Sequence, residues 1–231
     1  CKDMHPFGNV ACLQTVTGQQ ILDMLEWSTR YAPSEDGSFL HVSGLTYKIN
    51  TSTKNTTVKD EYDVWVSGPI KYRVHDVKVY NKENNCWEPL NLSAKYNLAG
   101  YNYTLRDLGG GFAMLNGAVN VLDYVSEDYM VLANYIKGFE NCTVDASNSP
   151  LLEKYSNFMI DYSDVNGSGR IKLVTNQEDS SQNDNNPLTG ESGAIFLILV
   201  LIVSAGVIKQ IKKNKVSTKL LSVFIVFALV F

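Results

Sequence analysis

The sequence is poor in the residues that build metal sites and disulfide scaffolds. It has 4 cysteines and 3 histidines in 231 residues, and no two cysteines stand in a Cys-x-x-Cys pattern. The wide cysteine spacing excludes a zinc ribbon and a dense disulfide framework, and leaves one or two bridges or buried free thiols as alternatives. His5, His41 and His75 are each isolated from spaced ligand partners. We therefore expect no metal site and no catalytic residue in this chain, because two-metal hydrolysis needs clustered ligands.

Basic residues are also in the minority. Lys and Arg number 20 against 24 Asp and Glu, which gives a formal net charge of -4. Binding to nucleic acid needs clustered Lys and Arg to neutralise phosphates, so we expect no nucleic-acid partner. The one basic cluster, at 209–215, adjoins an apolar run, which is typical of a membrane flank.

The start of the chain lacks the features of a secretory signal. It opens Cys-Lys-Asp-Met, with no basic n-region, and we interpret it as a piece of a longer protein. The 45% apolar composition is enough for one sizeable core with appendages.

Hydrophobic periodicity predicts an α+β domain over residues 1–174. Thr17 followed by Gln20 is a capping-box pattern, and apolar residues at helical spacing follow it. A second helix is expected from a cap at Ser126. β-rich stretches lie at 37–50, 72–80, 95–105 and 166–174. This order indicates a mixed sheet with flanking helices and not repeated βαβ units.

The C-terminal part has a different composition. Residues 175–186 are almost free of apolar side chains, so we expect a disordered linker. Residues 193–208 carry no charge; as a helix they reach about 24 Å, against about 30 Å for a bilayer core. Lys209 and Lys212 could snorkel to complete a span. A buried core helix is the alternative, but we expect a transmembrane segment.

The segment 187–215 resembles an anchor signal. The motif Asn-Pro-Leu-Thr-Gly ends at Gly190, and acidic Glu191, an apolar run and a basic cluster follow. This order is similar to the sorting signal of Gram-positive surface proteins, with Asn186 where leucine is usual. The resemblance implies sortase cleavage between Thr189 and Gly190 and attachment to the cell-wall peptidoglycan. A glycolipid anchor is the alternative, and the second apolar segment at 216–231 has no assigned role.

Six stretches resemble the C-terminal domain of the 5'-nucleotidase family in order and spacing. They are HPFGN at 5–9, TGQQILDMLEW at 17–27, GSFLHVSGLTYKI at 37–49, YRVHDVKV at 72–79, EPLNLSAKYNLAGYNYTLRDLGGGFAML at 88–115 and GSGRIKLV at 167–174. The resemblance covers most of residues 3–174 and implies that family's fold.

The resemblance also implies a substrate-binding site for a nucleoside. In the family, the base lies between two aromatic rings, which correspond here to Phe7 and Phe112, and Asn9 matches the position that hydrogen-bonds the base. Stacking on aromatic faces contributes about 1–3 kcal/mol per base and tolerates any base. The alternative for each ring is a core position at a turn. Glycines let a backbone approach a ligand closely, and the three beside Phe112 are Gly109, Gly110 and Gly111; the family usually has Asp where Gly110 stands.

The family's complete enzyme has an N-terminal metallophosphoesterase domain with two divalent metal ions, and an Asn-Gly-Gly-x-x-Arg segment that grips the phosphate. Neither is in this chain, and we interpret Arg73 and Arg106 as surface arginines in salt bridges. We therefore expect the nucleotide-recognition part of a surface-anchored 5'-nucleotidase-type hydrolase, extracellular and serving nucleotide catabolism and salvage. The alternatives are a non-catalytic, surface-anchored binding or adhesion module and a phosphatase for a non-nucleotide ester.

Overall fold

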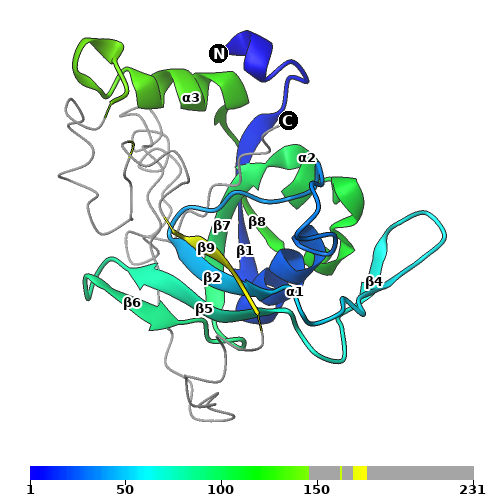
Figure 1. Ribbon diagram of the computed structural model, residues 1–231. Coiled ribbons are helices and arrows are strands. Elements are labelled where there is room, and N and C mark those ends of the chain that lie inside the picture. Colours follow the sequence, from blue (N-terminus) through cyan, green and yellow to red (C-terminus); the bar gives the residue numbers. More distant parts are fainter. Residues whose placement is uncertain (146–161, 163–168, 176–231) are drawn as a thin grey trace.

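The computed structural model describes residues 1–145, 162 and 169–175 of the chain (Figure 1). The predicted linker, the anchor signal with Thr189 and Gly190, the apolar run 193–208 and the segment 216–231 lie outside the described residues, apart from residue 175. Among the described residues, no helix has the length and apolar character needed to cross a membrane.

The first sheet has three antiparallel strands in the order β7-β1-β8. They are β1 (Val10–Thr17), β7 (Lys95–Tyr101) and β8 (Val119–Glu127). Ala11 pairs with Tyr101 and Val10 pairs with Glu127. The beginning of the central strand therefore lies beside the ends of both neighbours.

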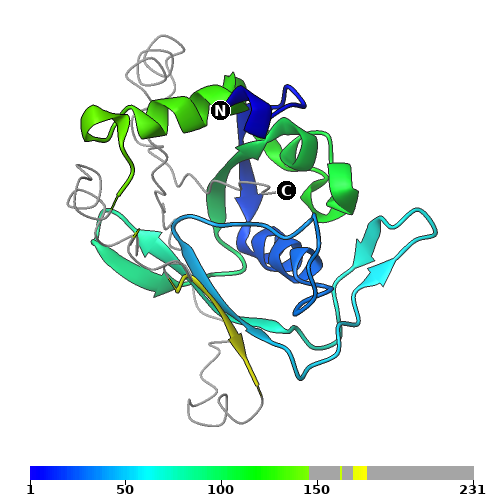
Figure 2. The same ribbon diagram turned by 45° about the horizontal axis from the view of Figure 1, so that its top comes forward.

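The second sheet has four strands in the order β6-β5-β2-β9. They are β2 (Leu45–Asn50), β5 (Val74–Asn81), β6 (Cys86–Pro89) and β9 (Ile171–Val174). Only the pairing of β2 with β9 is parallel among these. A separate hairpin, β3 (Val58–Lys59) and β4 (Trp65–Ser67), projects from the body as the cyan ribbon of Figure 2. The α+β class is confirmed, with the strands divided between sheets.

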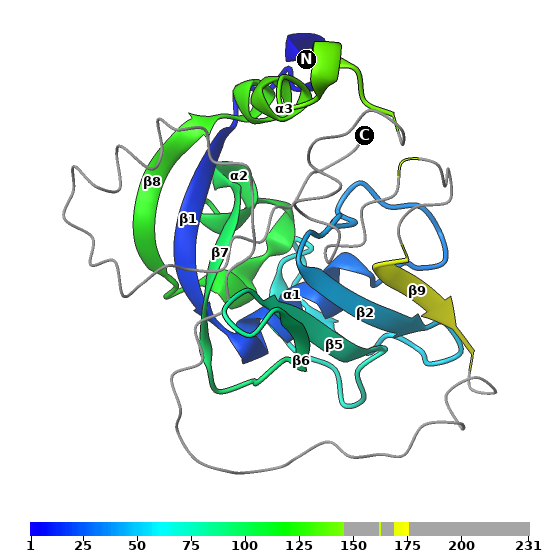
Figure 3. The ribbon, with the colours of Figure 1, turned by 90° about the vertical axis from the view of Figure 1, so that its left-hand side faces the viewer.

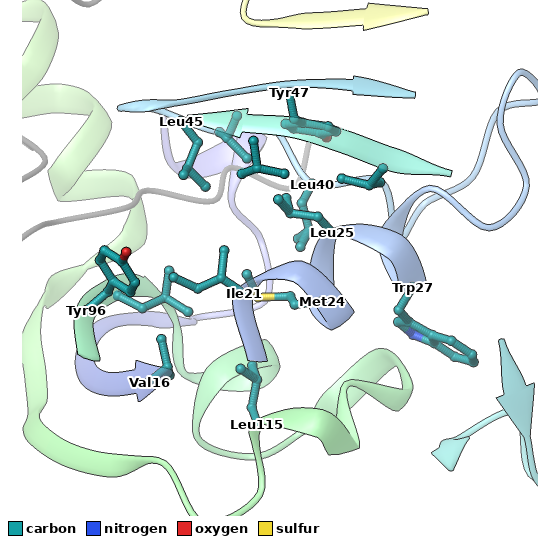
Figure 4. Packing of buried hydrophobic residues seen from close by; sticks show 14 of the residues in the cluster. Val16, Ile21, Met24, Leu25, Trp27, Leu40, Leu45, Tyr47, Tyr96 and Leu115 are labelled. Carbon is teal, nitrogen blue, oxygen red and sulfur yellow. The ribbon is translucent and has the colours of Figure 1, made fainter. Parts of the chain in front are cut away.

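Helix α1 (Gly18–Ser28) lies between the two larger sheets (Figure 3). Its predicted capping box is confirmed: the Gln20 N–H donates to Thr17 Oγ1 at 3.2 Å, and the Thr17 N–H donates to Gln20 Oε1 at 2.9 Å. Leu25 and Leu40 lie toward the strand residues Leu45 and Tyr47, while Leu115 packs on the other side of the helix (Figure 4). Burial of each such side chain contributes about 1.5–3 kcal/mol, so α1 is the centre of the core.

The other helical elements of the described residues are short. They are η1 (Lys2–Met4), α2 (Asn102–Leu105), η2 (Gly109–Gly111), η3 (Ala113–Leu115), α3 (Asp128–Ile136) and η4 (Glu140–Cys142). The predicted cap at Ser126 is wrong, because Ser126 lies in β8, where it pairs with Ala11 of β1, and α3 begins at Asp128. The stretch 95–105 is strand only to Tyr101, after which α2 follows.

Arg73 is not the surface arginine that the sequence predicted. It is 3% exposed, and its guanidinium donates to the backbone carbonyls of Thr29, Arg30 and Ala32 just beyond α1. The nearby Glu26 carboxylate is also buried and accepts the N–H groups of Arg73 and Val74, both at 2.9 Å. These bonds compensate the cost of burying two charged groups at the end of α1.

Candidate functional site

The antiparallel register brings the predicted site segments to one end of the first sheet. The 5–9 turn precedes β1, whereas α2 and the glycine-rich segment follow β7. Because the start of β1 pairs with the end of β7, both segments emerge at the same end of the sheet. The start of α3 joins them, because β8 also ends there. Figures 1 and 3 show the N-terminal segment, α2 and α3 at this end.

The 5–9 turn holds Phe7 away from the core, with 67% of its surface exposed. Pro6 restricts the backbone before the ring, and Gly8 adopts φ +67° with open space where a Cβ would stand. Glycine is thus favoured at position 8 by backbone conformation and not by crowding. The turn therefore leaves most of the Phe7 side chain exposed.

Asn9 fastens the turn through its backbone. Its carbonyl accepts the N–H of Asp128 at 3.1 Å, and the next N–H, of Val10, donates to Asn102 Oδ1 at 2.8 Å. Within the described residues, no hydrogen bond occupies the side-chain amide of Asn9. That amide is consequently open to a ligand beside Phe7, which is compatible with its predicted role.

The glycine-rich segment packs closely against α1 and the β3–β4 hairpin. Trp27 Nε1 donates to the carbonyl of Gly110 at 3.0 Å. A Cβ on Gly111 would overlap the carbonyl oxygen of Asp63 and lie 2.9 Å from Trp27 Cζ2, and its φ is +79°. In this conformation Gly111 allows close packing against other parts of the protein and not the approach of a ligand.

Phe112 occupies the core. It is 1% exposed and belongs to the cluster that contains Trp27 and Leu115. The described conformation therefore leaves no face of this ring open to a base, and the two predicted rings do not form an open slot. The stacking role of Phe112 stays a prediction that requires the ring to be uncovered.

An ion pair lies at the end of α2, just before the glycine-rich segment. Arg106 donates to both carboxylate oxygens of Asp107, at 2.7 and 3.1 Å, and Asn102 Nδ2 donates to the same carboxylate at 2.9 Å. These donors lower the pKa of Asp107, the Arg106 hydrogen bond foremost. Arg106 is the exposed, salt-bridged arginine that the sequence predicted. Since Asn102 also accepts from Val10, it ties α2 to the Phe7 turn.

A second polar cluster was missed from the sequence. His5 Nδ1 lies 3.1 Å from Tyr101 Oη and 3.7 Å from Asp128 Oδ2. Burial, and then the Asp128 carboxylate, raise the pKa of Tyr101 to about 12. No local signal could reveal the cluster, because its members come from the N-terminal turn, β7 and α3. Within the described part of the chain, no group of three or more His, Cys, Asp or Glu could hold a metal ion.

Comparison with known proteins gives a family match over residues 2–117, to the "5'-nucleotidase, C-terminal domain". No curated protein matches the chain. Among solved structures, a 5'-nucleotidase precursor from Thermus thermophilus is 24% identical with a TM-score of 0.49, over 74% of this chain and 26% of its own. An NAD nucleotidase from Haemophilus influenzae is 16% identical with a TM-score of 0.46, over 74% of this chain and 25% of its own. The chain thus spans about a quarter of the length of these structures.

Proposed function

The chain belongs to the 5'-nucleotidase C-terminal domain family, and we propose that it is the nucleotide-recognition part of a surface-anchored 5'-nucleotidase. The observation that carries this proposal is the exposed Phe7 beside the open amide of Asn9, on a turn that is hydrogen-bonded to α2, the helix that precedes the family's glycine-rich segment. A planar base can stack on the ring while the amide hydrogen-bonds the base edge.

Phe112 and the segment Gly109–Gly111 are proposed as the second wall of this site. Because the ring is buried, it could contact a base only after the segment moves away from Trp27. Phe7 is then the ring that a nucleoside meets first. Nucleoside binding to this chain alone should accordingly be weak, since stacking on one exposed ring supplies about 1–3 kcal/mol.

Hydrolysis of the phosphate ester is proposed to reside outside this chain. The partner is an N-terminal metallophosphoesterase domain that holds two divalent metal ions, as the resemblance implies. Two such ions would activate a water and neutralise the phosphate. The substrate is a nucleotide or nucleoside, and the role of this chain is to hold the base while the phosphate faces the metals.

Surface attachment is proposed from composition. The uncharged run 193–208 with its basic flank would insert into a membrane, and cleavage between Thr189 and Gly190 would transfer the domain to the cell wall. Deleting residues 187–231 should release the protein into the medium, as measured by its distribution between cells and supernatant. Unchanged retention on the cells would exclude this anchor.

The test of recognition is a titration of adenosine into the full chain in detergent, followed by NMR of the aromatic ring protons. We expect Phe7→Ala to weaken binding by about 1–3 kcal/mol, or about 5- to 150-fold. Tyr62→Ala is the matched control, because this ring is 78% exposed and lies on the turn of the β3–β4 hairpin and not on the Phe7 turn. Equal affinity of wild type and Phe7→Ala would reject the assigned role of Phe7.

A non-catalytic binding or adhesion module is the second candidate. The observation in its favour is the burial of Phe112, which leaves one ring where nucleotide recognition would use two. A folded wild-type chain that shows no ring shifts with adenosine would favour this candidate.

A further inference from the structure

Both ends of the exposed turn are fastened to one residue, Asp128, at the start of α3. At the near end, His5 Nδ1 faces Asp128 Oδ2 at 3.7 Å. At the far end, the Asp128 N–H donates to the carbonyl of Asn9 at 3.1 Å. Pro6, Phe7 and Gly8 form the exposed tip between these two points.

Among the residues that the structure describes, the carboxylate of Asp128 has few other partners. Its side chain is 1% exposed and that of His5 is 14% exposed, so water can contribute little to solvating either group. Oδ1 accepts the N–H of Tyr129 at 2.7 Å, while Oδ2 is directed at His5. A buried carboxylate needs a charged or hydrogen-bonding partner, and His5 is the titratable group that faces it.

We propose that His5 and Asp128 form a proton-controlled clip that holds the Phe7 turn in position for a nucleoside base. The choice of a nucleoside as the ligand rests on the proposed function, whereas the contacts that form the clip do not depend on it. His5 and Asp128 act as positioning residues, since it is Phe7 and Asn9 that would touch the base.

The sign of the pH dependence follows from which atom carries the proton. Tyr101 Oη and Asp128 Oδ2 both face His5 Nδ1, and Tyr101 stays neutral throughout the relevant range. A neutral imidazole gives Asp128 no charge attraction, whereas an imidazolium donates from Nδ1 and pairs with the carboxylate. Histidine is the side chain that changes charge between about pH 5 and 8. Acidification should therefore close the clip.

The other charged groups near the cluster do not reverse this sign. Lys2 of η1 lies 5.8 Å from the centre of the Tyr129 ring, and Glu127 precedes Asp128 at the end of β8. Lysine and glutamate are residue types that keep their charge across the range in which histidine changes its own.

A closed clip prepares the turn for binding. Holding Phe7 and Asn9 in one arrangement before the ligand arrives reduces the ordering cost of association. We expect adenosine to bind the full chain in detergent about three- to tenfold more tightly at pH 5.5 than at pH 8, the range that one partly buried ion pair supports.

The experiment has two readouts, adenosine affinity and hydrogen exchange of the Asp128 amide, each measured at about pH 5.5 and about pH 8. Exchange is corrected for its intrinsic pH dependence and is measured without ligand. The amide reports directly on the clip because it bonds Asn9. Slower corrected exchange at the lower pH is expected in the wild type, and in Asp128→Asn and His5→Gln the pH effect should vanish from both readouts.

The control is Asp76→Asn, which removes an exposed carboxylate paired with Lys48 and Lys78 on the second sheet. Asp76 has φ +49°, a conformation that asparagine tolerates, and the wild-type pH effects should persist. Should Asp128→Asn fail to fold, His5→Gln tests the same pair from the more exposed side.

The outcomes separate the clip from the proposed function. Amide exchange that is independent of pH in the wild type, or a pH effect that survives in His5→Gln, overturns the clip whatever the adenosine result. A pH effect that both variants abolish, together with no adenosine binding at either pH, supports the clip as a structural device and rejects nucleoside recognition.

Discussion

Replacing Phe112 by alanine separates a core role for this ring from a binding role. The side chain is 1% exposed and packs in the cluster with Trp27. Truncating a buried phenylalanine removes its transfer free energy and leaves a cavity, which together cost about 3–5 kcal/mol. We expect the free energy of unfolding of Phe112→Ala to fall by about that amount, or by about 6–20 °C in melting temperature at this chain length.

Two further variants serve as controls for this measurement of stability. Phe112→Leu keeps most of the volume and should lose about 1.5 kcal/mol or less. Phe7→Ala should change stability by about 0.5 kcal/mol or less, because that ring is 67% exposed. Urea unfolding followed by tryptophan fluorescence is a suitable assay, since Trp27 lies in the core.

The result that would refute the reasoning is a stable Phe112→Ala. A loss below about 1 kcal/mol would mean that the ring is not packed in solution as it is here. If adenosine affinity also fell in that variant, Phe112 would be a binding residue of an open slot. A large loss of stability in Phe112→Ala, with normal adenosine affinity in Phe112→Leu, would make Phe7 the ring that matters.

Three further predictions concern the framework of the site. Burial raises the pKa of Glu26 above its ordinary value, so the folded state binds the proton of this carboxyl more tightly than the unfolded state does. The free energy of unfolding therefore falls as pH rises through the folded-state pKa. Glu26→Gln should flatten this decline, measured by urea unfolding between about pH 4 and 7. Thr17→Ala removes the capping hydrogen bond and should cost about 0.5–2 kcal/mol in the same assay. Gly111→Ala should cost more than Gly8→Ala in thermal melts, because both have positive φ but only Gly111 also lacks space, and the φ cost alone is about 1–2 kcal/mol.

Features that depend on near neighbours in the chain were predictable. The capping box of Thr17 and Gln20 spans three residues and was identified correctly, as were the α+β class and the strand at 171–174. Strand β1 was not predicted, because four consecutive residues from Ala11 are buried and the apolar alternation of a half-buried strand is absent. Strand β8 was missed as well, and its pairing with β1 explains why α3 begins after Ser126.

Features that depend on distant partners were not predictable. Arg73 meets the carbonyl of Thr29 across 44 positions, and His5 meets Tyr101 across 96. A sequence states that a histidine or arginine is present but not which carbonyl or carboxylate the fold brings to it. The polar cluster at the Phe7 turn is for this reason a finding of the structure alone.

Phe7 and Phe112 could not be distinguished as sequence patterns, but they differ in burial in the structure. Phe7 lies at the end of the first sheet, where most of its surface stays exposed, whereas Phe112 follows a segment that is hydrogen-bonded to Trp27 of α1 through the Gly110 carbonyl. A base that entered between the two rings would have to break that hydrogen bond and remove Phe112 from the core. Recognition by both rings would therefore be coupled to the packing at the end of α1, so that a nucleoside gains a second stacking surface only at the expense of core stability.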